Sequence, residues 1–320
     1  IYTGEDTLSL HDALPILEQE IASFVGQEDA ILFSSGFGAN AGILRALLGQ
    51  NDIALVDPYI HTSAMAGLKG TNVKRIGHND LEYLEKTLKE TKDQYQTRLV
   101  IIDGVYSQDG DLSLLPEIIS LCKTHEAMLM LDDAHGIGVM GANGKGTAEH
   151  FNCLGQVDII TGTFSKSFGC VGGFAAASKK IIQYLKFYAD SNVFSAAPTP
   201  QVTASILKAL EIIKKEPAIR ARLWENTDYL RSRLTTEGFD IGKSVSPIFP
   251  IMIRDNKKVY EIAKMLQEKG IFTIGIVYPA VRTKEARLRV SVLATHEHEQ
   301  LDALINALND INKDIKIKKE

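Results

Sequence analysis

Cysteine is scarce in this sequence of 320 residues. The three cysteines, Cys122, Cys153 and Cys170, are too few and too scattered for a disulfide framework or a zinc site. His296 and His298 make a poor metal-binding pair, because residues two apart diverge on a helix. We therefore expect a reduced, cytoplasmic enzyme with no bound metal.

Two other features are missing. No apolar run reaches the length of a membrane span, and no basic run is interleaved with aromatic residues. The net charge is −5, which argues against a nucleic-acid surface. We therefore expect a soluble protein with neither a membrane span nor a nucleic-acid partner. With 45% hydrophobic residues, the chain can bury a large core and still form a second, smaller domain.

The segment from Thr161 to Gly169, TGTFSKSFG, places Lys166 among small and hydroxyl-bearing residues. The apolar run at residues 157–160 leads into it and is predicted to be a buried strand. Burial at a strand end would lower the pKa of the Lys166 amine and make it a nucleophile toward an aldehyde. A lysine taken at random is more often a solvated loop residue, so this segment alone does not decide the matter.

A second motif, Asp132-Asp133-Ala134-His135, follows the apolar run at residues 127–131. One strand that ends in an acid and another that ends in a lysine can place both groups on one side of a cofactor ring. Pyridoxal phosphate requires this pair, a lysine for the Schiff base and an acid that faces the pyridine nitrogen. We therefore predict pyridoxal 5′-phosphate as the cofactor, with Lys166 and Asp132 as catalytic residues.

A third motif, SSGFGAN, lies between a predicted strand at residues 30–33 and an apolar helix. A serine and glycine turn at a helix N-terminus binds phosphate through backbone N–H groups and the helix dipole. Gly36, Gly38 and Ala41, with Asp57 closing the next strand, also imitate a dinucleotide-binding fingerprint. An NAD-dependent dehydrogenase is therefore a less favoured alternative.

The alternation of strands and helices predicts an α/β fold with a doubly wound, mostly parallel sheet. Ligands bind at the carboxyl ends of such strands, where the candidate residues lie. A long helical stretch from Pro200 to about Arg231, interrupted near Pro217, leads into a smaller C-terminal α/β domain. We expect the large domain to span residues 17–231 and the small domain residues 232–320.

Residues 1–16 are predicted to be foreign to the fold. Residues 7–16, TLSLHDALPI, are the translation of a common sequencing adapter. Our hypothesis is that residues 1–16 are derived from that adapter and are fused to a gene that has lost its native N-terminal part. The first native helix is then expected to begin at Leu17.

Together, the motifs at residues 132–135 and 162–167 resemble those of the α-oxoamine synthases, a fold-type I pyridoxal phosphate family. The similarity covers about residues 17–311. The family includes 8-amino-7-oxononanoate synthases, serine palmitoyltransferases and 2-amino-3-ketobutyrate CoA ligases. The resemblance implies an aminotransferase type I fold and a C-acyltransferase that condenses an amino acid with an acyl-CoA, with decarboxylation, to an α-aminoketone. Residues 162–174 are closer to bacterial serine palmitoyltransferase and residues 132–136 to 8-amino-7-oxononanoate synthase, so the substrates stay open.

The resemblance also implies roles for single residues. His61 is expected to stack on the cofactor ring, and His135 and Ser107 to lie near its phenolic oxygen. Arg289 is expected to bind the substrate carboxylate, which a guanidinium matches bidentately, while Arg287 pairs structurally.

The cofactor phosphate is expected to bind at Gly36 and Phe37, with Thr163 nearby. Ser195 is a candidate phosphate ligand of the neighbouring subunit, in a homodimer with shared active sites, and an ordinary turn serine is an equally good interpretation. An aminotransferase or an aldolase has the same fold, lysine and aspartate, and only product analysis separates these alternatives from an acyltransferase.

Overall fold

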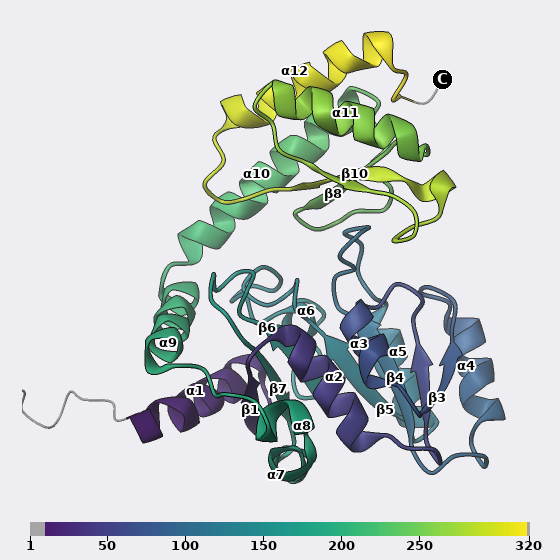
Figure 1. Ribbon diagram of the computed structural model, residues 1–320, viewed down its shortest axis with the longest axis vertical. Coiled ribbons are helices and arrows are strands. Elements are labelled where there is room, and N and C mark those ends of the chain that lie inside the picture. Colours follow the sequence, from purple (N-terminus) through teal and green to yellow (C-terminus); the bar gives the residue numbers. More distant parts are fainter. Residues whose placement is uncertain (1–9, 319–320) are drawn as a thin grey trace, which may run out of the picture. The chain divides into compact units, whose positions relative to one another are not determined.

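The computed structural model describes residues 10–318, which form two compact units (Figure 1). The first unit comprises the chain up to Val105 together with Ser113–Lys215. The second comprises Tyr106–Leu112 together with the chain from Glu216 onward. The domain boundary expected at residue 231 falls inside helix α10 (Pro217–Thr236), all of which belongs to the second unit.

The first unit is built on a seven-stranded sheet with the order β1-β7-β6-β5-β4-β2-β3. All its neighbouring strands are parallel except β7, which is antiparallel to both β1 and β6. This is the doubly wound, mostly parallel sheet that the sequence predicts. The strands are β1 (Asp29–Phe33), β2 (Ile53–Val56), β3 (Asn72–Arg75), β4 (Arg98–Asp103), β5 (Met128–Asp132), β6 (Ile159–Thr163) and β7 (Gly173–Ala177).

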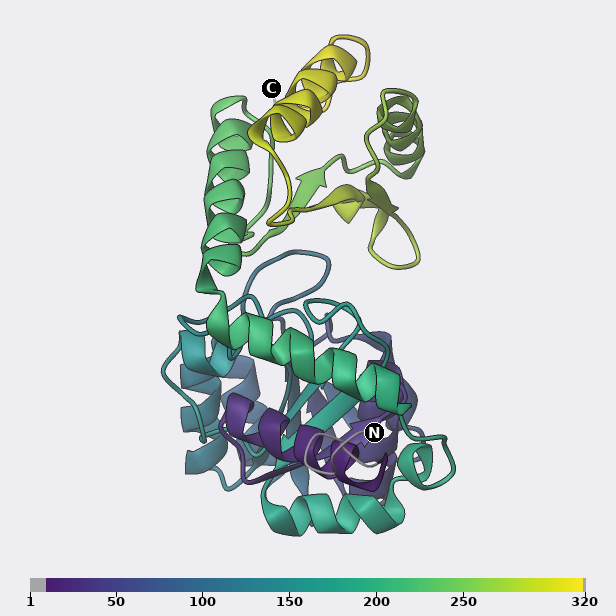
Figure 2. The same cartoon turned by 90° about the vertical axis from the view of Figure 1, so that its left-hand side faces the viewer.

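Helices cover both faces of this sheet (Figures 1 and 2). In β4, Val100 and Ile102 pack into one apolar cluster and Leu99 and Ile101 into another, because successive side chains of a strand point to opposite faces. Helices α1, α4, α5 and α9 contribute to the first cluster, and α2, α3 and α7 to the second. A strand that is apolar on both faces is typical of a parallel sheet between helical layers. The helices of this unit are α1 (Leu10–Val25), α2 (Gly36–Leu47), α3 (Thr62–Gly67), α4 (Leu81–Glu90), α5 (Leu115–Thr124), α6 (Thr147–His150), α7 (Lys179–Tyr188), α8 (Asp190–Val193) and α9 (Pro200–Lys215).

Helix α1 begins at Leu10, earlier than the expected start at Leu17, and contains Pro15. Leu17 and Ile21 are fully buried, so the predicted apolar stripe does face the core. Residues 1–9 lie outside the described part of the chain. The hypothesis that residues 1–16 derive from an adapter therefore stays a prediction.

The second unit is a three-stranded antiparallel sheet with the order β8-β10-β9, packed with three helices. Pro217 occupies the first turn of α10, where its missing N–H costs no helical hydrogen bond. The predicted interruption near Pro217 is thus confirmed, and it separates α9 from α10. The other elements are β8 (Ile248–Met252), α11 (Asn256–Glu268), β9 (Ile274–Ile276), β10 (Arg287–Ser291) and α12 (His298–Asp314).

Candidate active site

Two acidic side chains lie side by side at the carboxyl edge of the large sheet. Asp103 ends β4 and Asp132 ends β5, and the two are register partners in these parallel strands. Register partners project to the same face of a sheet, with neighbouring strands about 5 Å apart. The two carboxyl groups are therefore close neighbours. Strand β6, which leads to Lys166, is the next strand on the other side of β5.

The surroundings of the two acids distinguish them. Burial, reinforced by the Asp132 carboxylate, raises the pKa of Asp103 well above its ordinary value, although the His61 backbone N–H and the Lys166 charge act in the opposite direction. The surroundings of Asp103 therefore favour its uncharged form. Asp132 accepts hydrogen bonds from the Ala134 backbone N–H (3.0 Å) and from the Asn40 amide (2.6 Å). A carboxylate has about four lone-pair sites, so Asp132 can accept a further N–H.

Lys166 lies in the loop that joins β6 to β7. Phe164 and Phe168 anchor this loop, with their buried rings edge to face and 5.2 Å apart. The Ser167 hydroxyl donates to the Ile137 carbonyl (2.7 Å), which ties the lysine loop to the loop that follows Asp132. Lys166 itself is exposed. We expected Lys166 to be buried and its pKa to be lowered for that reason. The expected burial was wrong, because Phe164 and Phe168 take the buried positions on either side of Lys166.

The glycine turn packs against the end of β6. Ser35 caps α2, and its hydroxyl accepts from the Gly38 N–H at 3.0 Å. A Cβ atom on Gly36 would lie 2.8 Å from the Thr163 Cβ, so only glycine fits this approach. The first turn of α2 therefore packs against Thr163, whose hydroxyl donates to the Gly172 carbonyl at 3.1 Å, and the backbone N–H groups of a helix N-terminus suit a phosphate group. Phe37 follows Gly36 and is half exposed.

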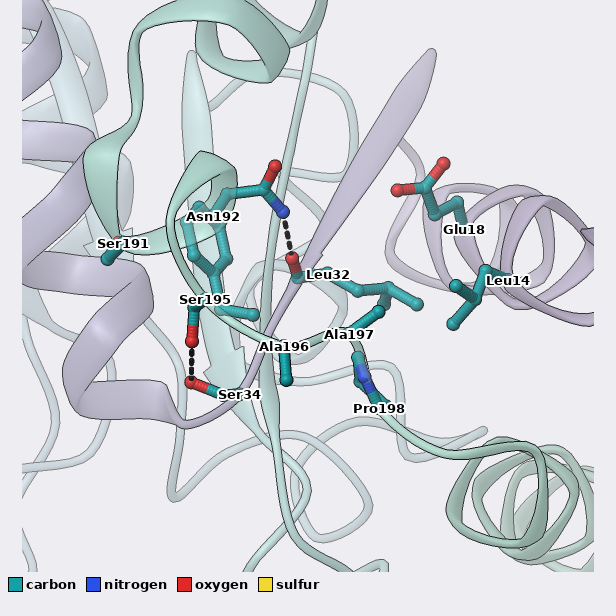
Figure 3. Close-up of a pocket in the computed structure, with 11 residues that line it drawn as sticks. Leu14, Glu18, Leu32, Ser34, Ser191, Asn192, Ser195, Ala196, Ala197 and Pro198 are labelled. Carbon is teal, nitrogen blue, oxygen red and sulfur yellow. Dashed lines mark hydrogen bonds between the residues drawn. The ribbon is translucent and has the colours of Figure 1, made fainter.

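A cavity of about 150 Å³ lies beside this turn, between α1, the end of β1 and the segment after α8 (Figure 3). The Ser195 hydroxyl donates to the Ser34 hydroxyl of the same chain at 3.2 Å. The Asn192 amide donates to the Leu32 carbonyl (2.7 Å) and holds this segment against β1. Ser195 is therefore next to its own phosphate turn, and its expected role toward a neighbouring subunit stays a prediction.

The two histidines expected near the cofactor ring are both in the first unit. His61 is exposed and caps α3, and its Nδ1 accepts from the Ser63 N–H at 3.3 Å. His135 is half buried in the turn after Asp132.

The sequence analysis missed Asn40, Ser63 and Thr161, three buried polar residues that contact one another around Asp132 and His61. Asn40 comes one helical turn after Gly36, and this spacing was the available signal, because residues four apart share a helix face.

Ser107 and Arg289 lie in the second unit and contact each other. The Arg289 Nε donates to the Ser107 carbonyl (2.6 Å), and its Nη1 donates to the Ser291 hydroxyl (2.7 Å). Arg287 is buried, pairs with Asp109 and donates to the Glu285 carbonyl. Arg287 therefore has the structural role expected of it, and the partly exposed Arg289 is the guanidinium available to a ligand.

Among the residues from 10 to 318, no group of three or more His, Cys, Asp or Glu side chains has the arrangement of a metal site. None of the helices in the same part of the chain combines the length and the apolar character that a bilayer crossing requires.

The residues of the first unit fit pyridoxal phosphate. Asp132 has unused acceptor sites for a ring N–H, Lys166 has an accessible amine, and the cradle at Gly36 has no room for a Cβ but offers backbone donors to a phosphate. A mostly parallel seven-stranded sheet with these groups at its carboxyl edge defines the class as the fold-type I pyridoxal phosphate enzymes. Residues 8–308 match the family described as aminotransferase class I and II, and the chain belongs to this family.

Proteins similar to this chain include serine palmitoyltransferases and 8-amino-7-oxononanoate synthases. The chain is 42% identical over 313 residues to a serine palmitoyltransferase of Sphingobacterium spiritivorum, an alignment that covers 97% of this chain and 77% of the relative. It is 39% identical over 312 residues to an 8-amino-7-oxononanoate synthase of Thermoanaerobacter pseudethanolicus, with 97% and 78% covered. A solved serine palmitoyltransferase with its pyridoxal phosphate internal aldimine superposes with a TM-score of 0.91 at 30% identity, with 97% and 78% covered. The resemblance to the α-oxoamine synthases is thereby confirmed.

Proposed function

We propose that this protein is a pyridoxal phosphate-dependent acyltransferase that condenses an amino acid with an acyl-CoA and releases carbon dioxide to give an α-aminoketone. The observation that carries the proposal is the arrangement of Asp132 at the end of β5 and Lys166 in the loop that follows the adjacent parallel strand β6, with the glycine turn packed against Thr163. Two relatives of about 40% identity are named serine palmitoyltransferase and 8-amino-7-oxononanoate synthase.

Pyridoxal phosphate, when bound, supplies an electron sink for negative charge at the amino acid Cα. Lys166 would hold the cofactor through its amine and would move the proton at the amino acid Cα. Asp132 would accept a hydrogen bond from the ring N–H, and its charge would favour the protonated ring. The N-terminus of α2 at Gly36, next to Thr163, would bind the phosphate, and His61 would stack on the ring.

Arg289 is proposed to orient the amino acid by binding its carboxylate through the guanidinium Nη groups. Its Nε is held by the Ser107 carbonyl, so the side chain is fixed before a ligand arrives. His135 and Ser107 are proposed to face the phenolic oxygen of the ring. A fixed guanidinium improves the rate by orientation, because a misplacement of about 1 Å costs roughly a hundredfold.

The proposed reaction is tested by incubating the purified protein and pyridoxal phosphate with alanine, glycine or serine, and with short-chain, long-chain or dicarboxylic acyl-CoA. We expect one pair to release free CoA and carbon dioxide in equal amounts, with an aminoketone identified by mass spectrometry. Formation of a keto acid without release of CoA would identify an aminotransferase instead. Retro-aldol products would identify an aldolase, and reduction of a nicotinamide cofactor a dehydrogenase.

We further propose that the protein is a homodimer with active sites shared between the subunits, and that it acts in the cytoplasm. Support for the dimer comes from large aromatic side chains exposed close to Ser195 in the sequence. The exposed fractions are 79% for Phe187, 63% for Tyr188 and 88% for Phe194. Covering such surface is favourable at about 25 cal/mol per Å².

The dimer is expected to weaken when this surface becomes charged. Phe187→Asp should shift the sedimentation profile toward monomer and reduce activity at low protein concentration. Tyr260→Asp is the matched control, because Tyr260 is 62% exposed on α11 and far from Ser195 in the sequence. A fully active wild-type monomer in sedimentation would disprove the shared site.

A further inference from the structure

Asn40 connects Asp132, the acid expected to face the pyridine nitrogen of the cofactor, to residues on neighbouring elements. Its Nδ2 donates to Asp132 Oδ2 at 2.6 Å, and its Oδ1 accepts from the Thr161 hydroxyl at 2.8 Å. The opposite orientation of the amide would place two acceptor oxygens, Asn40 Oδ1 and Asp132 Oδ2, against each other. The contacts therefore fix which end of the amide faces the carboxylate.

The second N–H of the Asn40 amide is directed toward His61, the histidine expected to stack on the cofactor ring. Asn40 Nδ2 donates to the Ser63 hydroxyl at 2.9 Å, and the Ser63 Oγ is 2.7 Å from His61 Nδ1. An amide nitrogen is only a donor, so the Ser63 oxygen accepts from Asn40, and its own proton can point to His61 Nδ1.

These contacts determine the tautomer of His61. The Ser63 backbone N–H also points at Nδ1, at 3.3 Å, so two donors from one residue converge on this nitrogen. A ring nitrogen that accepts hydrogen bonds carries no proton, and the ring proton is therefore on Nε2. The contacts thus favour the Nε2–H form of His61.

The residues of this network are rigidly placed. Asn40, Ser63 and Thr161 are 97% buried or more, and each is on a different element, α2, α3 and β6. Asn40 is on the helix whose N-terminus forms the phosphate cradle at Gly36. One helix therefore fixes both the phosphate end and, through Asp132, the nitrogen end of the expected cofactor.

We propose that Asn40 and Ser63 form a positioning relay that aims the Asp132 carboxylate at the ring nitrogen and orients His61 with its proton on Nε2. The inference rests on the proposed function and deepens it, by assigning two residues that set the geometry of the site without touching the substrate. Removal of the Asn40 amide leaves Asp132 with only the Ala134 N–H, and removal of the Ser63 hydroxyl leaves His61 Nδ1 with only the longer Ser63 N–H contact.

The first test compares Asn40→Ala and Asn40→Asp with Asn226→Ala. Asn226 is an equally buried asparagine on α10, and its amide donates to the Leu293 and His296 carbonyls, outside the site. For both Asn40 variants we expect the Kd of pyridoxal phosphate to rise roughly tenfold or more, since a hydrogen bond to a charged group is lost. We also expect an altered visible absorption spectrum of the bound cofactor. Asn226→Ala should lower the resistance to urea but leave the Kd and the spectrum at their wild-type values.

The second test reads the tautomer directly and requires neither cofactor nor substrate. Nitrogen-15 NMR of histidine-labelled apoprotein, with the His61 signals assigned from His61→Gln, should show Nδ1 unprotonated and Nε2 protonated. Ser63→Ala keeps only the 3.3 Å backbone contact to Nδ1 and should therefore add signals of the Nδ1-protonated form, whereas Ser63→Thr, which keeps the hydroxyl, should retain the wild-type signals.

The relay is disproved if Asn40→Ala keeps the wild-type Kd and spectrum, or if Asn226→Ala changes them equally. It is also disproved if His61 gives the same signals with and without the Ser63 hydroxyl. A protein that binds no pyridoxal phosphate would refute the proposed function, and the NMR comparison would still decide the His61 half of the relay.

Discussion

Lys166→Ala is expected to abolish the condensation and to remove the borohydride-reducible attachment of pyridoxal phosphate to the chain. No other lysine is on the loop that follows β6. In the proposed reaction the amine serves twice, as the nucleophile that holds the cofactor and as the group that moves the Cα proton. Acid–base catalysis alone contributes roughly 10²- to 10⁴-fold, so we expect turnover to fall at least a thousandfold.

The fold should survive this substitution. Lys166 is exposed, and Phe164 and Phe168 anchor its loop, so the free energy of unfolding of the apoprotein should change by less than about 0.5 kcal/mol. Lys180→Ala, at an exposed position on α7, is the control and should retain full turnover and the reducible attachment. Peptide mapping after borohydride reduction provides the measurement. A label that persists in Lys166→Ala would show that a different lysine holds the cofactor.

Asp132→Asn is expected to give the second largest loss, with turnover about 10²- to 10³-fold lower. Removing one preorganised electrostatic partner of a developing charge typically has a cost of this size. The substitution also disturbs the local hydrogen bonds, because a single amide oxygen cannot accept from both Ala134 and Asn40. We therefore expect cofactor affinity to fall too, by less than turnover does.

Asp103→Asn is the matched control for this prediction. Asp103 is the register partner of Asp132 and lies on the same face of the sheet. Burial raises the pKa of Asp103 well above its ordinary value and so favours its uncharged form, which an amide resembles more closely than it resembles a carboxylate. Turnover of Asp103→Asn should stay within a few-fold of wild type. The measurements are kcat and the Kd of the cofactor for each variant. Equal losses in the two variants would show that the charge of Asp132 has no special role.

The cofactor and the fold class could be predicted because their signals are local. Asp132 ends an apolar run and the segment with Lys166 follows another, and strand ends are visible in the sequence as a change from apolar to polar residues. The turn at Gly36 could be predicted for the same reason, because serine and glycine follow the apolar run at residues 30–33. Strand β7 was missed because Gly173–Ala177 consists mostly of small residues, and only pairing with β1 and β6 makes it a strand.

The sequence by itself determined the candidate chemical groups: a lysine, an acid and a phosphate turn, each coded within a few adjacent residues. Only the tertiary structure decided which residues support them. Strand order and register are non-local, so Asn40 reaches Asp132 across 92 positions of sequence, and no local pattern records that contact. The same pairing of distant strands put Lys166 at the surface, with its aromatic neighbours in the core. Burial is a property of the assembled sheet and its helices, and a residue's immediate neighbours in sequence do not fix it.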